Sequence, residues 1–177
     1  MDASPLAGWE NFYVIIGSSA GGLTGLTFVV IALVRDAARV QPAGLATYVT
    51  PTIAHFGAAL ALAAFLSMPR LSLPGVSAVL AVVGLPGLIY GGLLARRLRG
   101  QRTSPLYIPV REDWIWNVIF PSGAYGGLLI SGVLIWHRTP ATLYAVAGLS
   151  AALLFIGIRN AWDIAVWMTL RKEPDSK

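Results

Sequence analysis

The chain has 177 residues, of which 56% are hydrophobic and 12% are charged, and its mean hydropathy is +0.69. Soluble domains are about 45–50% apolar and about 25% charged, so a soluble fold of this composition would expose large apolar patches. The formal net charge is +5, but the basic residues lie between apolar runs, so nucleic-acid binding is not expected. The absence of cysteine from the sequence excludes disulfides, thiolate metal sites and cysteine nucleophiles. This composition predicts an integral membrane protein.

Five stretches of the chain are long and apolar enough to cross a bilayer as helices. A spanning helix needs about 20 apolar residues, because the hydrocarbon core is about 30 Å thick and an α-helix rises about 1.5 Å per residue. The runs do not alternate as the strands of a membrane barrel would. The sequence therefore predicts a single all-α transmembrane domain (residues 1–177), a bundle of about five transmembrane helices, with spans at residues 12–34, 45–68, 71–95, 114–136 and 140–170.

The first predicted span carries glycine at every fourth residue, at Gly17, Gly21 and Gly25. Small residues at this spacing share one helical face and let two helix backbones approach closely in lipid. The fourth span repeats the pattern at Gly123 and Gly127. For any one face, packing within the chain is the more common explanation. Because several helices of this small chain carry such faces, we expect at least one face to pack between subunits, in a homo-oligomer.

The first span also has a recognisable opening, Trp9-Glu10-Asn11-Phe12-Tyr13-Val14, followed by Gly17, Ala20, Leu23-Thr24-Gly25-Leu26 and Phe28-Val29. This pattern resembles the first helix of a group of small multi-spanning bacterial inner-membrane proteins of uncharacterised function. The resemblance covers that one helix. It implies a location in a bacterial inner membrane, and it implies no activity.

One histidine, His55, lies within the second predicted span, about ten residues from its start. An ionisable side chain at membrane depth is costly unless it is paired or hydrated, so His55 is a functional candidate. The plainer explanation, a hydrogen-bonded packing residue, is the more common one for a lone histidine. The other histidine, His137, lies near the opposite membrane face, which argues against a bis-histidine haem. The Asp, Glu and His residues supply no zinc ligand set, and no cofactor is predicted.

The longest gap between the predicted spans, residues 96–113, is a basic loop with five arginines. Ten of the 13 Lys and Arg residues fall on the same side as this loop, two (Arg70 and Arg138) fall on the other side, and Arg159 lies within a helix. The positive-inside rule then predicts a cytoplasmic loop, the N-terminus outside and the C-terminus in the cytoplasm. The loop arginines could also attract anionic headgroups, at about 1 kcal/mol each. Setting the orientation is the simpler explanation for them.

Three further polar residues are predicted in the cytoplasmic half of the bundle: Asn117 in the fourth span, and Arg159 and Asp163 four residues apart in the fifth. Residues at this spacing can pair on a helix. In one interpretation they line a polar path together with His55, because all four lie on the same side of the midplane. In the other, which the length of the fifth run favours, the span ends near Trp162, Arg159 extends to the interface, and the helix continues as an amphipathic extension.

The functional expectations follow from these few polar residues. No Ser–His–Asp set, phosphate-binding loop or pair of catalytic carboxylates is recognisable in the sequence, so we expect a protein that is not an enzyme. The first hypothesis is a homo-oligomeric channel or transporter for an ion or small solute. The second is a structural or regulatory subunit that binds another membrane protein through a glycine-rich face. The expected partners are the lipid bilayer, a second copy of the chain and, in the second hypothesis, another membrane protein.

Overall fold

The structure is a computed structural model that describes residues 5–37, 42–101, 111–137 and 139–170, with side chains at 5–32, 50–100, 111–137 and 139–166. Every regular element in these ranges is helical. Three segments, α4, η1 and α5, follow one another without a break, so the described chain forms five long helices. The elements are α1 (Glu10–Ala37), α2 (Pro42–Leu66), α3 (Leu73–Gln101), α4 (Arg111–Trp114), the π-helical segment η1 (Ile115–Ile119), α5 (Phe120–Leu134) and α6 (Thr139–Leu170).

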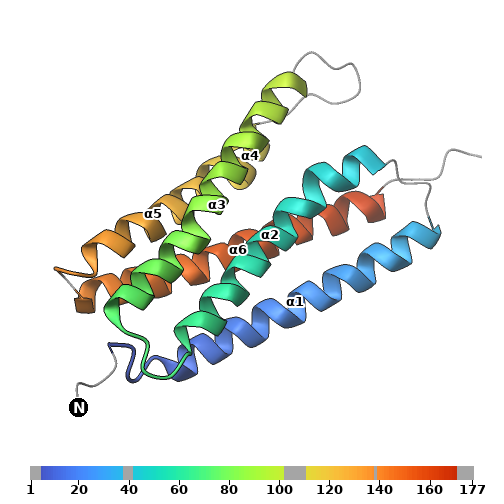
Figure 1. Cartoon of the computed structure of the whole chain (residues 1–177). Coiled ribbons are helices and arrows are strands. Elements are labelled where there is room, and N and C mark those ends of the chain that lie inside the picture. Colours follow the sequence, from blue (N-terminus) through green and yellow to red (C-terminus); the bar gives the residue numbers. More distant parts are fainter. Residues whose placement is uncertain (1–4, 38–41, 102–110, 138, 171–177) are drawn as a thin grey trace, which may run out of the picture.

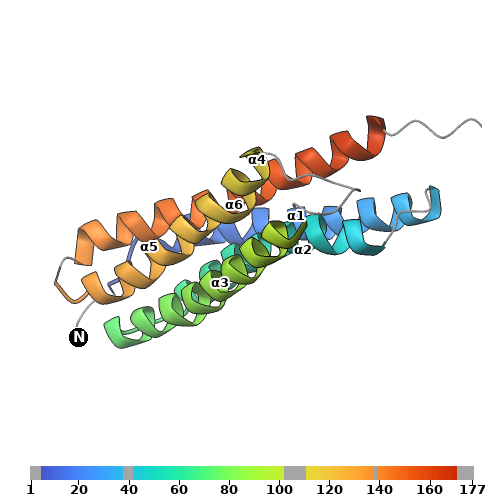
Figure 2. The same ribbon diagram turned by 90° about the horizontal axis from the view of Figure 1, so that it is seen from above.

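The five helices lie lengthwise beside one another (Figures 1 and 2). The helix α2 packs on α1 and α6, α3 packs mainly on α5, and α5 packs on α6. One end of the bundle, here called the turn end, holds Glu10 and the short α2–α3 and α5–α6 connections. The opposite end, the loop end, holds the last turns of α3 and α6 and the start of α4 (Figure 1). The described chain therefore begins at one end of the bundle and finishes at the other.

Four helices are long and apolar enough to cross a membrane, over Glu10–Ala32, Leu73–Gly100, Arg111–Leu134 and Thr139–Val166. The part of α2 with described side chains, Thr50–Leu66, is apolar but shorter. Large apolar side chains also face outward, as lipid contact requires; Val133 is 68% exposed and Phe155 is 69% exposed. The structure thus confirms an all-helical architecture in the described residues, with the properties of a helical membrane protein.

The predicted basic loop, residues 96–113, is longer than the connection in the structure. The helix α3 continues to Gln101 and α4 begins at Arg111, while residues 102–110 lie outside the described part of the chain. Leu94 and Leu98 are buried, with 3% and 1% exposure, on this last part of α3. The arginines that end the apolar run therefore do not end the helix, because α3 keeps a packed face beyond them.

The fourth long helix departs from the prediction in a second way. It begins three residues before the predicted Trp114, and it contains the π-helical turn η1, in which the Phe120 N–H donates to the Ile115 carbonyl oxygen. Pro121 follows immediately, in the first turn of α5. Because proline has no N–H to donate, it interrupts the regular helical hydrogen bonds. The helix widens just before it, as π-helical insertions do.

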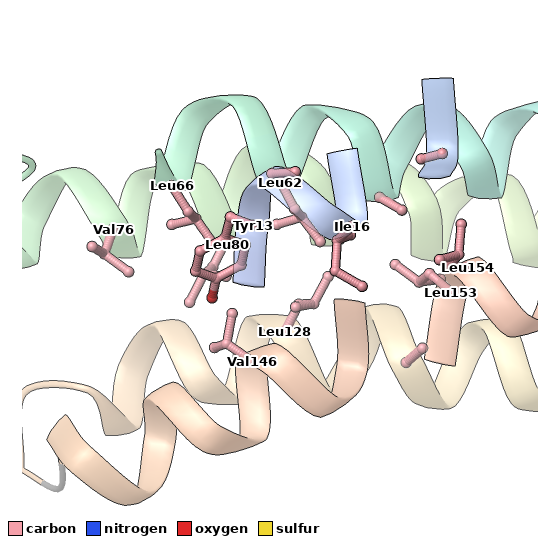
Figure 3. Packing of buried hydrophobic residues seen from close by; sticks show 14 of the residues in the cluster. Tyr13, Ile16, Leu62, Leu66, Val76, Leu80, Leu128, Val146, Leu153 and Leu154 are labelled. Carbon is pink, nitrogen blue, oxygen red and sulfur yellow. The ribbon is translucent and has the colours of Figure 1, made fainter. Parts of the chain in front are cut away.

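The turn end of the bundle has an apolar core (Figure 3). Tyr13 of α1, Leu62 of α2, Leu80 of α3, Leu128 of α5 and Val146 of α6 are all fully buried there. Each of the five long helices therefore contributes to one shared core. Burying an aliphatic or aromatic side chain contributes about 1.5–3 kcal/mol in water, although for lipid-embedded helices close packing is the larger part of the gain.

The predicted glycine face of α1 packs within the chain at two of its three positions. A Cβ at Gly17 would lie 3.0 Å from the Cβ of Ala63, and one at Gly21 would lie 4.0 Å from Leu60, both on α2. Gly25 has no neighbouring atom within 4 Å of that position. Close α1–α2 packing therefore accounts for Gly17, a Cβ at Gly21 would make an ordinary van der Waals contact with α2, and Gly25 stays open.

Of the two predicted packing glycines on the fourth long helix, one packs within the chain and the other does not. A Cβ at Gly127 would lie 3.0 Å from the Leu149 side chain of α6, whereas Gly123 is exposed with no atom within 4 Å. Gly127 thus belongs to the α5–α6 contact. Gly123, like Gly25, is exposed and makes no such contact with another described helix.

Candidate functional site

A histidine and a tyrosine form a buried polar pair inside the bundle. His55 on α2 is 1% exposed and Tyr125 on α5 is 3% exposed. The Nδ1 atom of His55 lies 2.9 Å from the Tyr125 hydroxyl oxygen, and the ring centroids are 5.8 Å apart. The hydroxyl donates to Nδ1 in one histidine tautomer and accepts from Nδ1–H in the other. In both tautomers the bond connects α2 to α5.

Two glycines make room for the aromatic rings at this level. A Cβ at Gly87 of α3 would overlap the Tyr125 ring, and a Cβ at Gly157 of α6 would overlap the ring of Phe56, the buried neighbour of His55. Glycine at these positions therefore lets α3 approach α5 and lets α6 approach α2. We call His55, Phe56, Gly87, Tyr125 and Gly157 the His55 layer.

Two buried nitrogens, His55 Nε2 in this layer and Asn160 Nδ2 beside it, have no hydrogen-bond partner in the part of the chain that is described. Asn160 is 5% exposed and lies one turn beyond Gly157, on the side of α6 that faces α2. Because α2 and α6 run antiparallel, the helical rise separates His55 from Asn160 by only about 3 Å along the bundle axis. An unpaired buried polar group costs about 1–3 kcal/mol and commonly marks a bound water or ligand.

A charged cluster lies nearer the loop end, where α6 meets α4 and η1. Arg159 pairs with Asp163 on the same helix, and its Nη2 atom lies 3.9 Å from Glu112 Oε2 on α4. Its guanidinium carbon is 5.5 Å from the ring centroid of Trp116, within cation–π range. The side chains of Arg159, Asp163 and Glu112 are 33%, 51% and 76% exposed, so this Arg159 cluster lies at the surface of the bundle.

A second cation–π contact connects α3 to α4 at the same end, with the Arg99 guanidinium carbon 5.9 Å from the Trp114 ring centroid. Asn117 lies half-buried in η1, directly after Trp116. Trp114 thus directly precedes the π-helical turn and Trp116 lies within it, and each forms a cation–π contact with an arginine of another helix. These contacts hold the loop ends of α3 and α6 against α4 and η1.

The structure places the four predicted path residues in two groups. Arg159 and Asp163 pair as their spacing predicts, and Asn117 lies beside the Trp116 that stacks on Arg159. His55 is bonded to Tyr125 in the interior of the bundle. The Arg159 cluster is half-exposed and lies toward the loop end. The buried part of the site is the His55 layer with Asn160.

The site predicted from the sequence did not include Tyr125, Glu112 or Trp116. Of these three, Tyr125 could have been identified from its position within its predicted span. Tyr125 lies 11 residues after the predicted start of the fourth span, and His55 lies ten residues after the start of the second, in helices that run the same way. At about 1.5 Å per residue, the two side chains are at nearly equal depth. Glu112 and Trp116 left no such signal, because their position against α6 depends on how the helices rotate.

The site is therefore defined by its own geometry, a buried histidine layer with two unpaired nitrogens and a half-exposed arginine cluster toward the loop end. No protein-family model, curated protein or solved structure matches the chain.

Proposed function

We propose that the chain is a multi-pass protein of a bacterial inner membrane, with five crossings, the N-terminus outside and the C-terminus in the cytoplasm. Four helices have the length and hydropathy of spans, and α2, with 25 residues, is long enough to be the fifth. Among the described residues, Arg96, Arg97, Arg99 and Arg111 lie toward the loop end, and the positive-inside rule assigns that end to the cytoplasm. The turn end then faces outside.

The cysteine-free chain allows this orientation to be tested with single cysteines. A membrane-impermeant maleimide is expected to label Ser4→Cys in intact spheroplasts and to label Ser176→Cys only after permeabilisation. Labelling of both variants at equal rates in intact spheroplasts would exclude termini on opposite sides. The unmodified chain, which has no thiol, is the blank for this measurement.

The function that this geometry supports best is the binding and passage of an ion or small polar solute, in a homo-oligomeric channel or transporter. The observation that carries the proposal is the pair of unpaired buried nitrogens, His55 Nε2 and Asn160 Nδ2. Polar groups at membrane depth are costly and usually mark solute paths. The turn half of the bundle has the apolar core shown in Figure 3, and it also buries Ser131 and the Tyr13 hydroxyl, which has no partner among the described residues. We expect the solute to reach the His55 layer from the loop end, past the Arg159 cluster.

Flux into liposomes tests this proposal. We expect the reconstituted protein to carry protons or alkali cations faster than empty vesicles, read with pH- and potential-sensitive dyes. His55→Ala and Asp163→Asn are expected to lower the flux at least tenfold, which is more than they lower the folded fraction. The control is Phe155→Ala, because Phe155 is 69% exposed on the outer surface of α6. Equal losses of flux and of folded protein would assign these residues to packing instead.

A second candidate function, a subunit that binds another membrane protein, rests on the outer face of α1. This helix is the least buried of the four candidate spans, with 11% of its most apolar window buried. Gly22 and Gly25 are exposed there, with no atom within 4 Å of a Cβ position. Small residues that face lipid allow another helix to approach closely.

Crosslinking distinguishes self-association from partner binding. Gly25→Cys in native membranes is expected to give a disulfide-linked dimer if two α1 faces pack together. It is expected to give a heteroconjugate if another protein covers the face. Gly148→Cys, also exposed and open but on α6, is the matched control. Recovery of only uncrosslinked monomer from Gly25→Cys would remove α1 as the interface.

A further inference from the structure

One outward face of α3 is apolar as far as Leu93 and becomes basic at Arg96. Leu85, Ile89 and Leu93 are exposed by 54%, 56% and 50%, and Arg96 and Arg97 follow them on the same side of the helix and are also exposed. We call these five residues the α3 outer face.

The opposite side of α3 is occupied by the rest of the bundle. Leu94 and Leu98 are buried there, and the glycines on that side approach α5. No other residue in the described ranges covers the outer face in this way. Gly92 also lies on it, with no atom within 4 Å of a Cβ position, so there is room directly beside the arginines.

The point along α3 at which the outer face changes from apolar to basic lies about one membrane thickness from the start of the helix. Arg96 is 23 residues beyond Leu73, the first residue of α3, which corresponds to about 35 Å of helix. The hydrocarbon core is about 30 Å thick. If α3 enters the bilayer near Leu73, the leucines and isoleucine lie at acyl-chain depth and the arginines lie among the phosphates.

The positive charge at this level has no partner within its own helix. The sequence of α3 contains no Asp or Glu, and Arg96, Arg97 and Arg99 fall within one turn. Arg99 stacks over Trp114. Of the two acids of α4, Glu112 and Asp113, the first is paired with Arg159. A bound anion would therefore complement this cluster.

We propose that the loop end of the α3 outer face is a binding site for an anionic phospholipid. Arg96 and Arg97 hold the phosphate of the headgroup, and the acyl chains lie along Leu93, Ile89 and Leu85. Guanidinium groups suit phosphate because they offer several N–H donors in one plane. The apolar face that leads directly to the arginines favours a lipid over free phosphate or an acidic soluble protein. This site would exist whether or not the chain transports a solute.

Native mass spectrometry of the purified full chain in detergent tests the proposal. The probes are phosphatidylglycerol and phosphatidylcholine with identical acyl chains. At about 1 kcal/mol per basic residue, the double variant Arg96→Gln/Arg97→Gln is expected to bind phosphatidylglycerol roughly thirtyfold more weakly. The control Arg70→Gln/Arg138→Gln makes the same change in charge at the two arginines that the positive-inside count assigns to the outer side, and its binding is expected to stay unchanged.

Both variants keep most of the Lys and Arg residues that the sequence assigns to the cytoplasmic side, so the orientation is not expected to change. Equal binding of the two lipids by the unmodified chain would overturn the proposal. So would a similar loss in both double variants, which would indicate a general charge effect. Displacement of the lipid by millimolar inorganic phosphate would indicate a simple anion site instead, and would also overturn it.

Discussion

Replacing Gly157 by alanine is expected to destabilise the protein by about 2 kcal/mol, because the new methyl group would overlap the ring of Phe56. Phe56 is fully buried beside His55, so the ring cannot move aside without disturbing the His55 layer. For a chain of this size, the midpoint of thermal unfolding in detergent should fall by roughly 5 °C. Intrinsic tryptophan fluorescence during a temperature ramp measures this change.

The matched control is Gly148→Ala on the same helix. Gly148 is exposed, with no atom within 4 Å of a Cβ position, so alanine there should leave the stability unchanged or raise it by up to about 1 kcal/mol through helix propensity. If Gly157→Ala does not fold, the addition of Phe56→Leu should restore folding by shortening the overlapping side chain. Equal effects of the two glycine substitutions would contradict the close α2–α6 contact.

Removing the Tyr125 hydroxyl should also be costly. Tyr125→Phe leaves the Nδ1 atom of the buried His55 without its partner, and an unsatisfied buried group costs about 1–3 kcal/mol. Tyr144→Phe makes the same chemical change at a residue that is 71% exposed, where the cost should stay below about 0.5 kcal/mol. Thermal unfolding of both variants under identical conditions gives the comparison.

A double-mutant cycle isolates the His55–Tyr125 bond from the packing of the two rings. His55→Leu and Tyr125→Phe together should cost less than the sum of the single variants, by about 0.5–3 kcal/mol, because the second substitution removes a group that the first left unpaired. Additive costs would mean that the 2.9 Å contact contributes nothing to stability. The same four proteins can be measured for flux, which separates a transport role of His55 from its structural role.

The glycine faces show which part of helix packing can be predicted from residue spacing and which part cannot. Spacing by four residues predicts a shared helical face, but each step of four turns about 40° beyond a full turn. Gly25 is therefore rotated by about 80° from Gly17. In the structure Gly17 faces Ala63 of α2, and Gly25 is open. The pattern predicted close packing, and the neighbouring helix decided which of the glycines provide it.

Local properties of the sequence determined the helical architecture, the four candidate spans and the Arg159–Asp163 pair. Apolar length, helical rise and i,i+4 spacing act within one segment, so no knowledge of the other helices is needed. Only the tertiary structure decided that His55 bonds Tyr125, that Arg159 meets Glu112 and Trp116, and that α3 remains helical past its arginines. These contacts depend on the rotation and register of helices against one another. Rotation and register are set by how all the side chains of the bundle pack together, which no single segment encodes.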